Sequence, residues 1–518
     1  MPDSIDHFDL ERSSDISLEQ NWAFIATNIP PETRAWTDTT TPNPEFWYRL
    51  TGKTKNGVTI PYNVVSIRRQ TTPGAFAWQQ FIRQQTAFKN IIVNGIDVDA
   101  SGVVAVGYFF GSADFGDGVI YTSAGERDIF VAKYTNGTSP TLQWVKTFGG
   151  ALLDQATAVA IDSSGNIAVV GMIGSAVDFG SGAVPFLGNT DIFVLKLSSV
   201  GATLWAHSYG ETAGDAATSV CVDSTGKIYV AGYVGFGPVN FGAAGILTGK
   251  GSQNGFILKI DSDSLGTSLW AKRFVCGGFG DANVIKGICI NSQNKVVVGG
   301  FYTGTIDTGG STIPTATNGA GCLFLTSVSN DGATHNWDMF PDSTGFNAMY
   351  GVAPDPSNSN GDVVITGPIS GTANFGSISI TTNGGTGIFV GKVNNLGVAQ
   401  WVKPYGGDPS STDQGVSVSV DNSGSIYVTG TAQSVLAFGG NFYYGNGGAN
   451  FFAFKLLSDK TEVWIKRILP AAGAIIKASR IAQEVFIGGD TSGPVDFGGG
   501  NVTFQVPGRE GFLVKYST

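Results

Sequence analysis

Charge is scarce in this chain of 518 residues, and positive charge is the scarcer kind. Charged residues make up 14% of the chain, against about a quarter in ordinary soluble domains. The 30 Lys and Arg residues are outnumbered by 40 Asp and Glu, which leaves a net charge of −10. Long exposed helices need charge along one face, so we do not expect a helical protein. Without a basic surface to attract phosphate groups or anionic lipid, we expect no binding to nucleic acid or membrane surfaces.

Reactive and metal-binding side chains are also few. The chain has three histidines, His7, His207 and His335, and its four cysteines form no Cys-x-x-Cys pair. Since no Ser-His-Asp or Cys-His arrangement is present, we expect no catalytic residue, no metal and no cofactor. No stretch approaches 18 apolar residues, which predicts that the chain does not insert into a membrane. The acidic segment Met1–Asp15 lacks the basic and apolar regions of a secretory signal, so we expect no export by that route.

Glycine and aromatic residues are abundant instead. The chain has 74 Gly, about 14% and twice the usual share, together with 34 Phe, 15 Tyr and 10 Trp. A hydrophobic content of 42% is enough for a large core, which excludes a disordered chain. We therefore predict an all-β protein.

Seven tryptophans recur at intervals of 61 to 67 residues, at Trp78, Trp144, Trp205, Trp270, Trp337, Trp401 and Trp464. A sustained period of this size indicates a solenoid, an array or a propeller. Each repeat contains four segments with the pattern of strands, as at residues 158–161, 167–170 and 191–196 and around Trp205. The first two are joined by an Asp-x-x-Gly turn such as Asp162 to Gly165, in which Asp can bond backbone amides and Gly can take positive φ. Four short antiparallel strands per repeat predict a propeller blade.

The two ends of the repeat region complement each other. The last repeat stops at Thr518 without a tryptophan strand, and a lone tryptophan strand, Phe76–Ile82, precedes the first complete repeat. We expect this N-terminal strand to close the final sheet, because closure removes the exposed sheet edges. The prediction is a seven-bladed β-propeller over residues 71–518, with about 64 residues per blade.

These motifs resemble the bacterial SBBP-type β-propeller repeat, which pairs V-D-x-x-G-x-h-x-V-x-G with D-x-F-V-x-K and L-W-x-K-x-F-G-G. The resemblance covers about residues 75–518 and departs from the pattern in the fourth repeat, where Asn291 to Asn294 replaces Asp-x-x-Gly. It implies a fold and no reaction. In six repeats the third strand carries a lysine near its end, and we expect its ammonium group to remain in water, at Lys133, Lys196, Lys259, Lys392, Lys455 and Lys515.

Residues 1–70 form a separate unit that partly resembles a fibronectin type III domain. The resembling segments are Phe8–Arg12, Trp22–Ile25, Thr33–Asp38, Phe46–Leu50, the pair Asn56-Gly57 and Thr59–Ile67. No room remains for the first two strands of such a sandwich, so a sheet edge is expected to be exposed. Either a partner chain or the propeller covers that edge, or the unit is a minimal five-stranded domain closed by its own loops.

One polar series recurs eight residues before each turn Asp or its equivalent, at Asp154, Asp215, Asn283, Asn347 and Asp413. Because strands alternate in direction, the start of each innermost strand shares a face with the loop between the second and third strands. These side chains are therefore predicted to ring the channel mouth, as a site for a cation or a hydroxyl-rich ligand. The alternative is that each caps its own connecting turn, since one local role then recurs in every repeat.

The composition and the incomplete sandwich resemble tail, baseplate and fibre components of bacteriophages. We expect a non-enzymatic structural or adhesive component of a phage or phage-tail-like particle, assembled in the host cytoplasm. Residues 1–70 would dock to other particle proteins, and the propeller would make structural contacts or bind host-surface carbohydrate. The alternatives are a secreted bacterial cell-surface adhesin and a polysaccharide-degrading enzyme that uses carboxylates of the propeller face.

Overall fold

The computed structural model contains two compact units, Met1–Ala75 and Phe76–Ser517. It describes the chain except for residues 1–4, 14–22, 30–46, 55–58, 62–74, 87–88, 138, 279, 311–313, 317–320, 410, 434, 444–449, 469–471, 479–483, 493–494, 496, 498–507 and 518. The boundary between the units follows Ala75, five residues beyond the expected end of the first domain at residue 70. Among the described residues, no helix is both long enough and apolar enough to cross a membrane.

The first unit contains one antiparallel sheet in the order β2-β1-β3-β4. Its strands are β1 (Ile5–Ser13), β2 (Ala23–Ile29), β3 (Trp47–Thr54) and β4 (Thr59–Pro61). The strands expected at residues 8–12, 22–25 and 46–50 correspond to β1, β2 and β3. The segment Thr33–Asp38 and the turn at Asn56-Gly57 lie outside the described residues. The resemblance to a fibronectin type III domain stays a prediction.

The second unit repeats one antiparallel pattern of four strands in sequence order. Sheet A contains β6 (Lys89–Asp99), β7 (Gly102–Phe109), β10 (Asp128–Tyr134) and β11 (Leu142–Phe148). Sheet B contains β12 (Gln155–Ile161), β13 (Ile167–Ile173), β14 (Asp191–Leu197) and β15 (Thr203–Tyr209). Sheet C contains β16 (Ala216–Val222), β17 (Ile228–Val234), β20 (Asn254–Ile260) and β21 (Ser268–Arg273).

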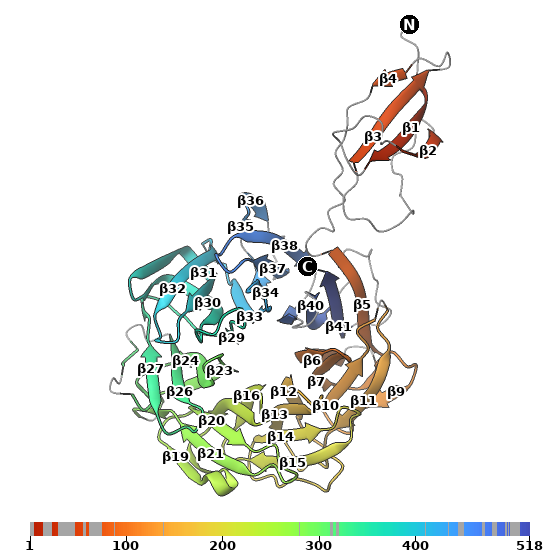
Figure 1. Cartoon of the computed structure of the whole chain (residues 1–518). Coiled ribbons are helices and arrows are strands. Elements are labelled where there is room, and N and C mark those ends of the chain that lie inside the picture. The colour runs from red at the N-terminus through yellow and green to blue at the C-terminus, as the bar shows by residue number, and fades with distance from the viewer. Residues whose placement is uncertain are drawn as a thin grey trace. The chain divides into compact units, whose positions relative to one another are not determined.

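The same pattern continues through three further sheets. Sheet D contains β23 (Asn283–Ile290), β24 (Lys295–Tyr302), β26 (Cys322–Ser329) and β27 (His335–Met339). Sheet E contains β29 (Gly351–Pro354), β30 (Val363–Phe375), β31 (Ile378–Val393) and β32 (Ala399–Gly406). Sheet F contains β33 (Gln414–Val420), β34 (Ile426–Ala432), β37 (Asn450–Leu456) and β38 (Glu462–Ile468). The predicted all-β, propeller-like fold is confirmed: Figure 1 shows the sheets around a common centre, with the first strand of each innermost.

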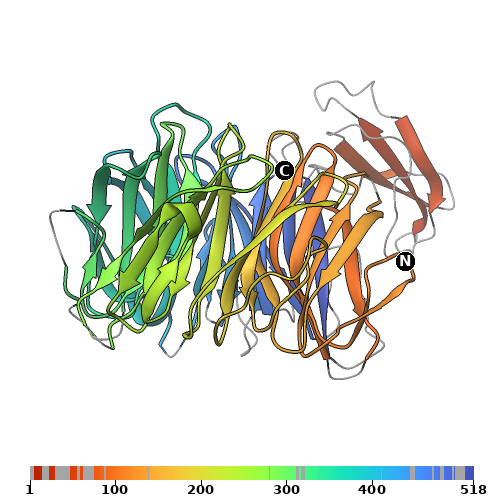
Figure 2. The same cartoon turned by 90° about the horizontal axis from the view of Figure 1, so that it is seen from below.

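A terminal sheet joins the two ends of this unit. It contains β39 (Ala472–Ala478), β40 (Glu484–Thr491), β41 (Gly508–Ser517) and β5 (Ala75–Gln84). Strand β41 is hydrogen-bonded to β40 and to β5, and Arg83 of β5 forms an ion pair with Glu510 of β41 at 2.9 Å. The ring of Trp78 lies 5.8 Å from that of Phe486, so the lone tryptophan strand packs as part of the last sheet. In the side view of Figure 2, the strands of the sheets cross the thickness of a disc.

Short elements extend the loops of several sheets, mostly between the second and third strands. They are β8 (Ser112–Asp114), β9 (Ile120–Thr122), β18 (Gly237–Asn240), the 3-10 turn η2 (Gly242–Ala244), β19 (Ile246–Gly249), β22 (Val275–Cys276), β25 (Ile306–Asp307), β28 (Asp342–Ser343), β35 (Leu436–Phe438) and β36 (Asn441–Tyr443).

The sequence Asp-Phe-Gly recurs between the second and third strands, as at residues 114–116 and 178–180, and its phenylalanine belongs to the blade core. In sheet B, Asp178 Oδ1 accepts hydrogen bonds from the amides of Gly180 and Gly182, which closes a tight turn. Phe179, between Asp178 and Gly180, is fully buried, and its ring lies 5.1 Å from that of Phe193 on the third strand. The triplet therefore fixes the loop between the second and third strands onto its own sheet.

The Asp-x-x-Gly turns have a second role, which corrects an expectation about the third-strand lysines. Asp162 Oδ1 accepts hydrogen bonds from the amides of Ser164 and Asn166, and its Oδ2 receives Lys196 Nζ at 2.7 Å. The expectation that this ammonium group remains in water is wrong, because Lys196 is only 3% exposed. Burial by itself would raise the pKa of Asp162, but the bond and charge of Lys196 and the bonds from Asn166 outweigh it and lower that pKa.

The tryptophans of four outer strands lie against a turn glycine of the next sheet. Gly201 in sheet B has φ +80°, and a Cβ atom built on it would lie 2.9 Å from Trp144 Cδ2 of sheet A. The same contact joins Gly266 to Trp205, Gly332 to Trp270 and Gly397 to Trp337. Only glycine combines positive φ with such a close approach. The tryptophan period therefore marks the contact between successive blades.

Sheet F departs from this rule at Lys460. Its amide donates to Leu457 O, as Gly397 N donates to Asn394 O, but Lys460 carries a side chain at φ 68°. We predict that Lys460→Gly raises the free energy of unfolding by about 0.5 to 1 kcal/mol, because a left-handed residue with a Cβ atom is strained. Urea unfolding of the full chain measures this. Gly397→Ala is the matched control, and it should destabilise because its Cβ would meet Trp337. A loss of stability in both variants would contradict the prediction.

Candidate functional site

The polar series predicted to ring the channel mouth is buried in the structure. Asp154, Asp215, Asn283, Asn347 and Asp413 are all 0% exposed. Asp154 Oδ2 accepts a hydrogen bond from Gly150 N in the loop before β12, and its Oδ1 accepts one from Gly174 N just after β13. Asp154 therefore bonds to the loops at both ends of its hairpin, and none of the five residues is among those that line the central channel.

The other members of the series also bond to backbone groups. Asp215 accepts from Glu211 N and Gly235 N, Asp413 accepts from Gly407 N and Gln433 N, Asn283 accepts from Gly255 N and donates to Phe274 O, and Asn347 accepts from Ser370 N and donates to Gly345 O. Asp215, Asn347 and Asp413 each tie the loop before the first strand to the end of the second strand, the arrangement expected of the capping alternative. Asn283 instead bonds to Gly255 of sheet C and to Phe274, which follows that sheet. Ligand binding by the series stays a prediction.

Burial changes the acidity of two of these carboxyl groups. Desolvation raises the pKa of Asp154 and that of Asp215 to about 6, although the amide bonds at each carboxylate oppose the increase. In the folded protein these groups therefore take up protons at a higher pH than they do in the unfolded chain.

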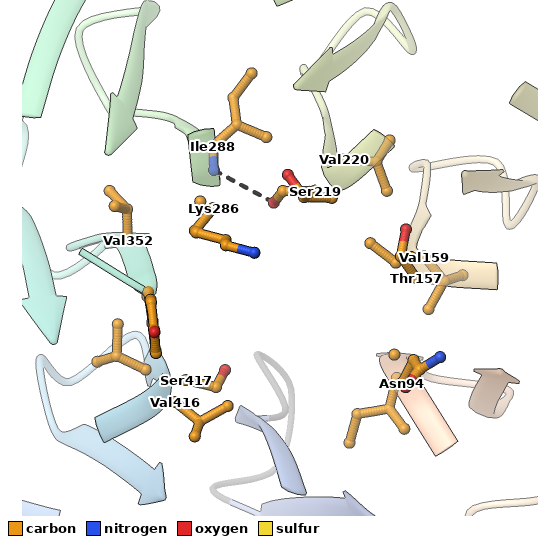
Figure 3. Close-up of a pocket in the computed structure, with 18 of the residues that line it drawn as sticks. Asn94, Thr157, Val159, Ser219, Val220, Lys286, Ile288, Val352, Val416 and Ser417 are labelled. Carbon is orange, nitrogen blue, oxygen red and sulfur yellow. Dashed lines mark hydrogen bonds between the residues drawn. The ribbon is translucent and has the colours of Figure 1, made fainter. Parts of the chain in front are cut away.

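A cavity of about 540 Å³ lies at the centre of the second unit (Figure 3). Its wall is made by the innermost strands β6, β12, β16, β23 and β33 and by the start of β29. The polar residues in its lining are Asn94, Gln155, Thr157, Thr218, Ser219, Lys286, Tyr350 and Ser417. This volume falls within the usual range for sites that hold small molecules, so the central cavity is the candidate functional site.

A β-bulge places one side chain of each innermost strand in the cavity wall. In five sheets, the pairing of the first strand with the second strand skips one residue of the first strand. These first strands are β6, β12, β16, β23 and β33. The skipped residues are Asn94, Thr157, Thr218, Lys286 and Val416, and Tyr350 holds the same place just before β29. A bulge leaves its extra residue unpaired and redirects its side chain, which explains why the five bulge residues line the cavity.

In the first three sheets the bulge residue connects neighbouring blades. Asn94 Nδ2 donates to Ala156 O at 2.9 Å, Thr157 Oγ1 to Ala217 O at 2.7 Å and Thr218 Oγ1 to Ile285 O at 2.6 Å. Each bond runs from one innermost strand to the next. Val416 in sheet F cannot donate such a bond. Lys286 in sheet D has no hydrogen bond or ion pair with any residue that the structure describes.

The sequence contains a signal for these residues that the motif analysis overlooked. Each bulge residue after the first follows a member of the buried polar series by three positions, as Lys286 follows Asn283. The first position of this pair is Asp or Asn in all five repeats, whereas the position three residues later is Thr, Lys, Tyr or Val. Repeats that share a backbone structure differ in binding at the positions where their residues vary. Lys286 stands out at such a position because the rest of the segment Val284–Ile290 is apolar.

The remaining candidates for chemistry make local contacts. The His207 ring lies 5.2 Å from that of Trp205, and its Nε2 lies 2.7 Å from Leu265 O. His335 Nε2 lies 2.9 Å from Asp338 Oδ1. Within the described part of the chain, no group of three or more His, Cys, Asp or Glu side chains is placed to hold a metal ion.

Comparison with known families finds a β-propeller repeat of the SBBP type at residues 400–436. This segment contains the tryptophan strand of sheet E and the first two strands of sheet F. A search of curated proteins found no match. The repeat and the strand arrangement together define an all-β protein with a propeller-like fold.

Comparison with solved structures finds matches of low sequence identity and low TM-score. Quinohemoprotein alcohol dehydrogenase from Comamonas testosteroni is 11% identical, with 86% of this chain and 76% of that chain covered and a TM-score of 0.39. A polysaccharide lyase of family PL25, an ulvan lyase, is 11% identical, with coverage of 80% and 92% and a TM-score of 0.37. A leech intramolecular trans-sialidase is 8% identical, with coverage of 86% and 94% and a TM-score of 0.30. At this level of similarity the activities of these enzymes say nothing about this chain.

The two raised carboxyl pKa values predict how stability depends on pH. A folded-state pKa of about 6, above the ordinary 3.8, means that the folded chain binds protons more tightly than the unfolded chain between these values. The contribution of Asp154 to the free energy of unfolding should therefore increase as the pH falls from 7 to about 4, by at most roughly 3 kcal/mol. We predict that Asp154→Asn reduces this increase, measured as the difference in urea midpoint between pH 7 and pH 5. Exposed Glu126→Gln is the control. An unchanged difference in Asp154→Asn would contradict the raised pKa.

Proposed function

We propose that the repeat region is a closed seven-bladed propeller that serves as a rigid, non-catalytic binding and display scaffold. Closure is supported by the pairing of β41 with β5 and by the short parallel ladder that joins Gly508 and Arg509 of β41 to Lys89 and Asn90 of β6. The terminal sheet then has neighbours on both sides, and no blade is left with an uncovered face.

The distribution of buried apolar residues supports the same blade count. Among the described residues, the core divides into seven clusters, and each takes side chains from two neighbouring sheets. Strand β5 takes part in two of them: Phe81 packs with sheet F, and Trp78 packs with sheet A. A ring of seven blades has seven such interfaces.

If the ring of blades is closed by β5, truncation of Trp78 should strongly reduce the stability of the protein. If β5 completes the seventh blade, Trp78→Ala leaves a cavity between two blades and should cost about 3 to 5 kcal/mol of unfolding free energy. Trp464→Ala is the matched control within a continuous repeat, since both tryptophans are buried. Chemical unfolding of the two full-length variants is the measurement. A loss below about 1 kcal/mol for Trp78→Ala, with a large loss for Trp464→Ala, would show that β5 does not complete the ring.

The non-catalytic proposal rests on one observation: the recurring carboxylates are buried and hydrogen-bonded. An enzyme that uses carboxylates of the propeller face needs them exposed to substrate. Asp154 and Asp215 instead have both oxygens bonded to backbone amides inside the loops. This supports structural use of the repeated acids and leaves the variable loops and the central cavity for binding.

The biological setting is proposed from composition and from the first unit. We place the chain in a phage or phage-tail-like particle, with residues 1–70 docking to other particle proteins and the propeller displayed for structural contacts or host-surface carbohydrate. The described sheet of the first unit ends at β2 and β4, and such edges suit the addition of a strand from a partner. A cell-surface adhesin remains the second candidate, because the same scaffold serves either location.

Measuring both binding and degradation of the same carbohydrates distinguishes a binding protein from an enzyme. We expect the full chain to bind one or more bacterial surface polysaccharides on a glycan array without shortening them, as judged by size-exclusion profiles after long incubation. Depolymerisation by the full chain that is lost in Asp154→Asn or Asp413→Asn would contradict the non-catalytic proposal. Affinity purification from the native source distinguishes the settings: recovery with tube or baseplate proteins supports the particle, and recovery with cell-envelope material supports the adhesin.

A further inference from the structure

The central cavity contains one cation and no anion in its described wall. Lys286 is the single charged residue among the residues that line it. The innermost strands β12, β16, β23, β29 and β33 contain no Asp or Glu, and neither does the sequence of β39, Ala-Gly-Ala-Ile-Ile-Lys-Ala. Asp97 on β6 lies outside the lining, and its Oδ2 accepts a hydrogen bond from Ile161 N. The protein has a net charge of −10, yet this cavity is positive.

The Lys286 side chain makes no contact with a described residue that would explain it as a residue stabilising the fold. The bulge residues of sheets A to C connect one blade to the next, but Lys286 makes no such bond within the described part of the structure. Val416 holds the equivalent place in sheet F, so the fold accepts an apolar residue there. Figure 3 shows the Lys286 amino group pointing into the open centre of the channel. Burial lowers the pKa of Lys286, as expected for an ammonium group without a counter-charge.

Hydrogen-bond donors accompany the ammonium group. Ser219 accepts a hydrogen bond from Ile288 N through its oxygen, which leaves its O–H to donate (Figure 3). Tyr350 also lines the cavity, and burial raises the pKa of its phenol, so the O–H keeps its proton at neutral pH. An ammonium group and two hydroxyl donors, without a carboxylate, form a set that complements the acceptor oxygens of an anion.

We propose that Lys286, Ser219 and Tyr350 form a binding site for a small oxyanion in the central channel: a carboxylate, sulfate or phosphate group. The group belongs either to a free inorganic ion or to a small organic molecule, and the cavity volume of about 540 Å³ accommodates a molecule of monosaccharide size. This site is independent of the display role proposed above, because it lies inside the ring and uses no surface loop.

The test is calorimetric titration of the full chain with sodium sulfate, sodium phosphate and sodium glucuronate, at constant ionic strength in chloride. At least one of the three should bind with a stoichiometry of one, and glucuronate distinguishes an organic carboxylate from a free inorganic ion. Lys286→Met should weaken this binding roughly tenfold or more, because a charge-assisted hydrogen bond is lost, whereas Lys286→Arg should retain most of it. Lys146→Met, at an exposed position of β11, should bind as the parent does.

Two results would overturn the site: absence of binding by all three ions, or equal affinity in the parent chain and Lys286→Met. We expect Lys286→Met to fold, since Val416 holds the equivalent position, and circular dichroism checks this. If it does not fold, acylation of lysine amines in the parent chain provides the second measurement. The bound ion should slow modification of Lys286 but not of Lys146, and equal rates with and without the ion would likewise reject the site.

Discussion

Packing between consecutive sheets is the interaction on which the rest of this structure depends. A four-stranded blade has two apolar faces, and only the blades beside it can cover both. The core is accordingly distributed over the interfaces, and each cluster is shared by two sheets. At the rim, Trp144 lies on Gly201 of the next sheet, and at the channel Thr157 donates to Ala217 O of the next sheet. Both contacts point in the same direction around the unit.

This dependence explains why the strands were predictable from the sequence. The tryptophan period, the Asp-x-x-Gly turns and the lysine at the end of each third strand recur because each interface repeats the same contacts. Asn291 to Asn294 illustrates the physical basis: the turn has no glycine, yet Asn294 takes φ 56° and its amide bonds to Asn291 O as in the glycine-containing turns. Asparagine tolerates this conformation better than other residues with a Cβ atom, so the geometry survives the change of sequence.

The candidate site was not predictable in the same way. Motif spacing identified Asp154 and its equivalents as unusual, but spacing does not show whether a carboxylate points to the channel or into a loop. That outcome depends on which backbone amides the connecting loops present, as Gly150 and Gly174 do for Asp154. The buried ion pair of Lys196 with Asp162 depends likewise on a tertiary contact. The bulge that exposes Lys286 arises from the pairing of β23 with β24. The offset of three positions from Asn283 marks where the bulge lies, but not that the side chain of Lys286 enters the channel.

The pairing of β5 with β41 has a consequence for biosynthesis. Arg83 and Glu510 are separated by 427 positions, so their contact forms only after the segment between them and β41 itself have left the ribosome. At about 5 to 20 residues per second, synthesis of that intervening length takes on the order of 20 to 90 seconds. During this time β5 has no partner from β41, and its apolar side chains Trp78, Phe81 and Ile82 are without half of their final surroundings. The nascent polypeptide therefore needs protection from self-association at β5 until β41 has been synthesised and can pair with it.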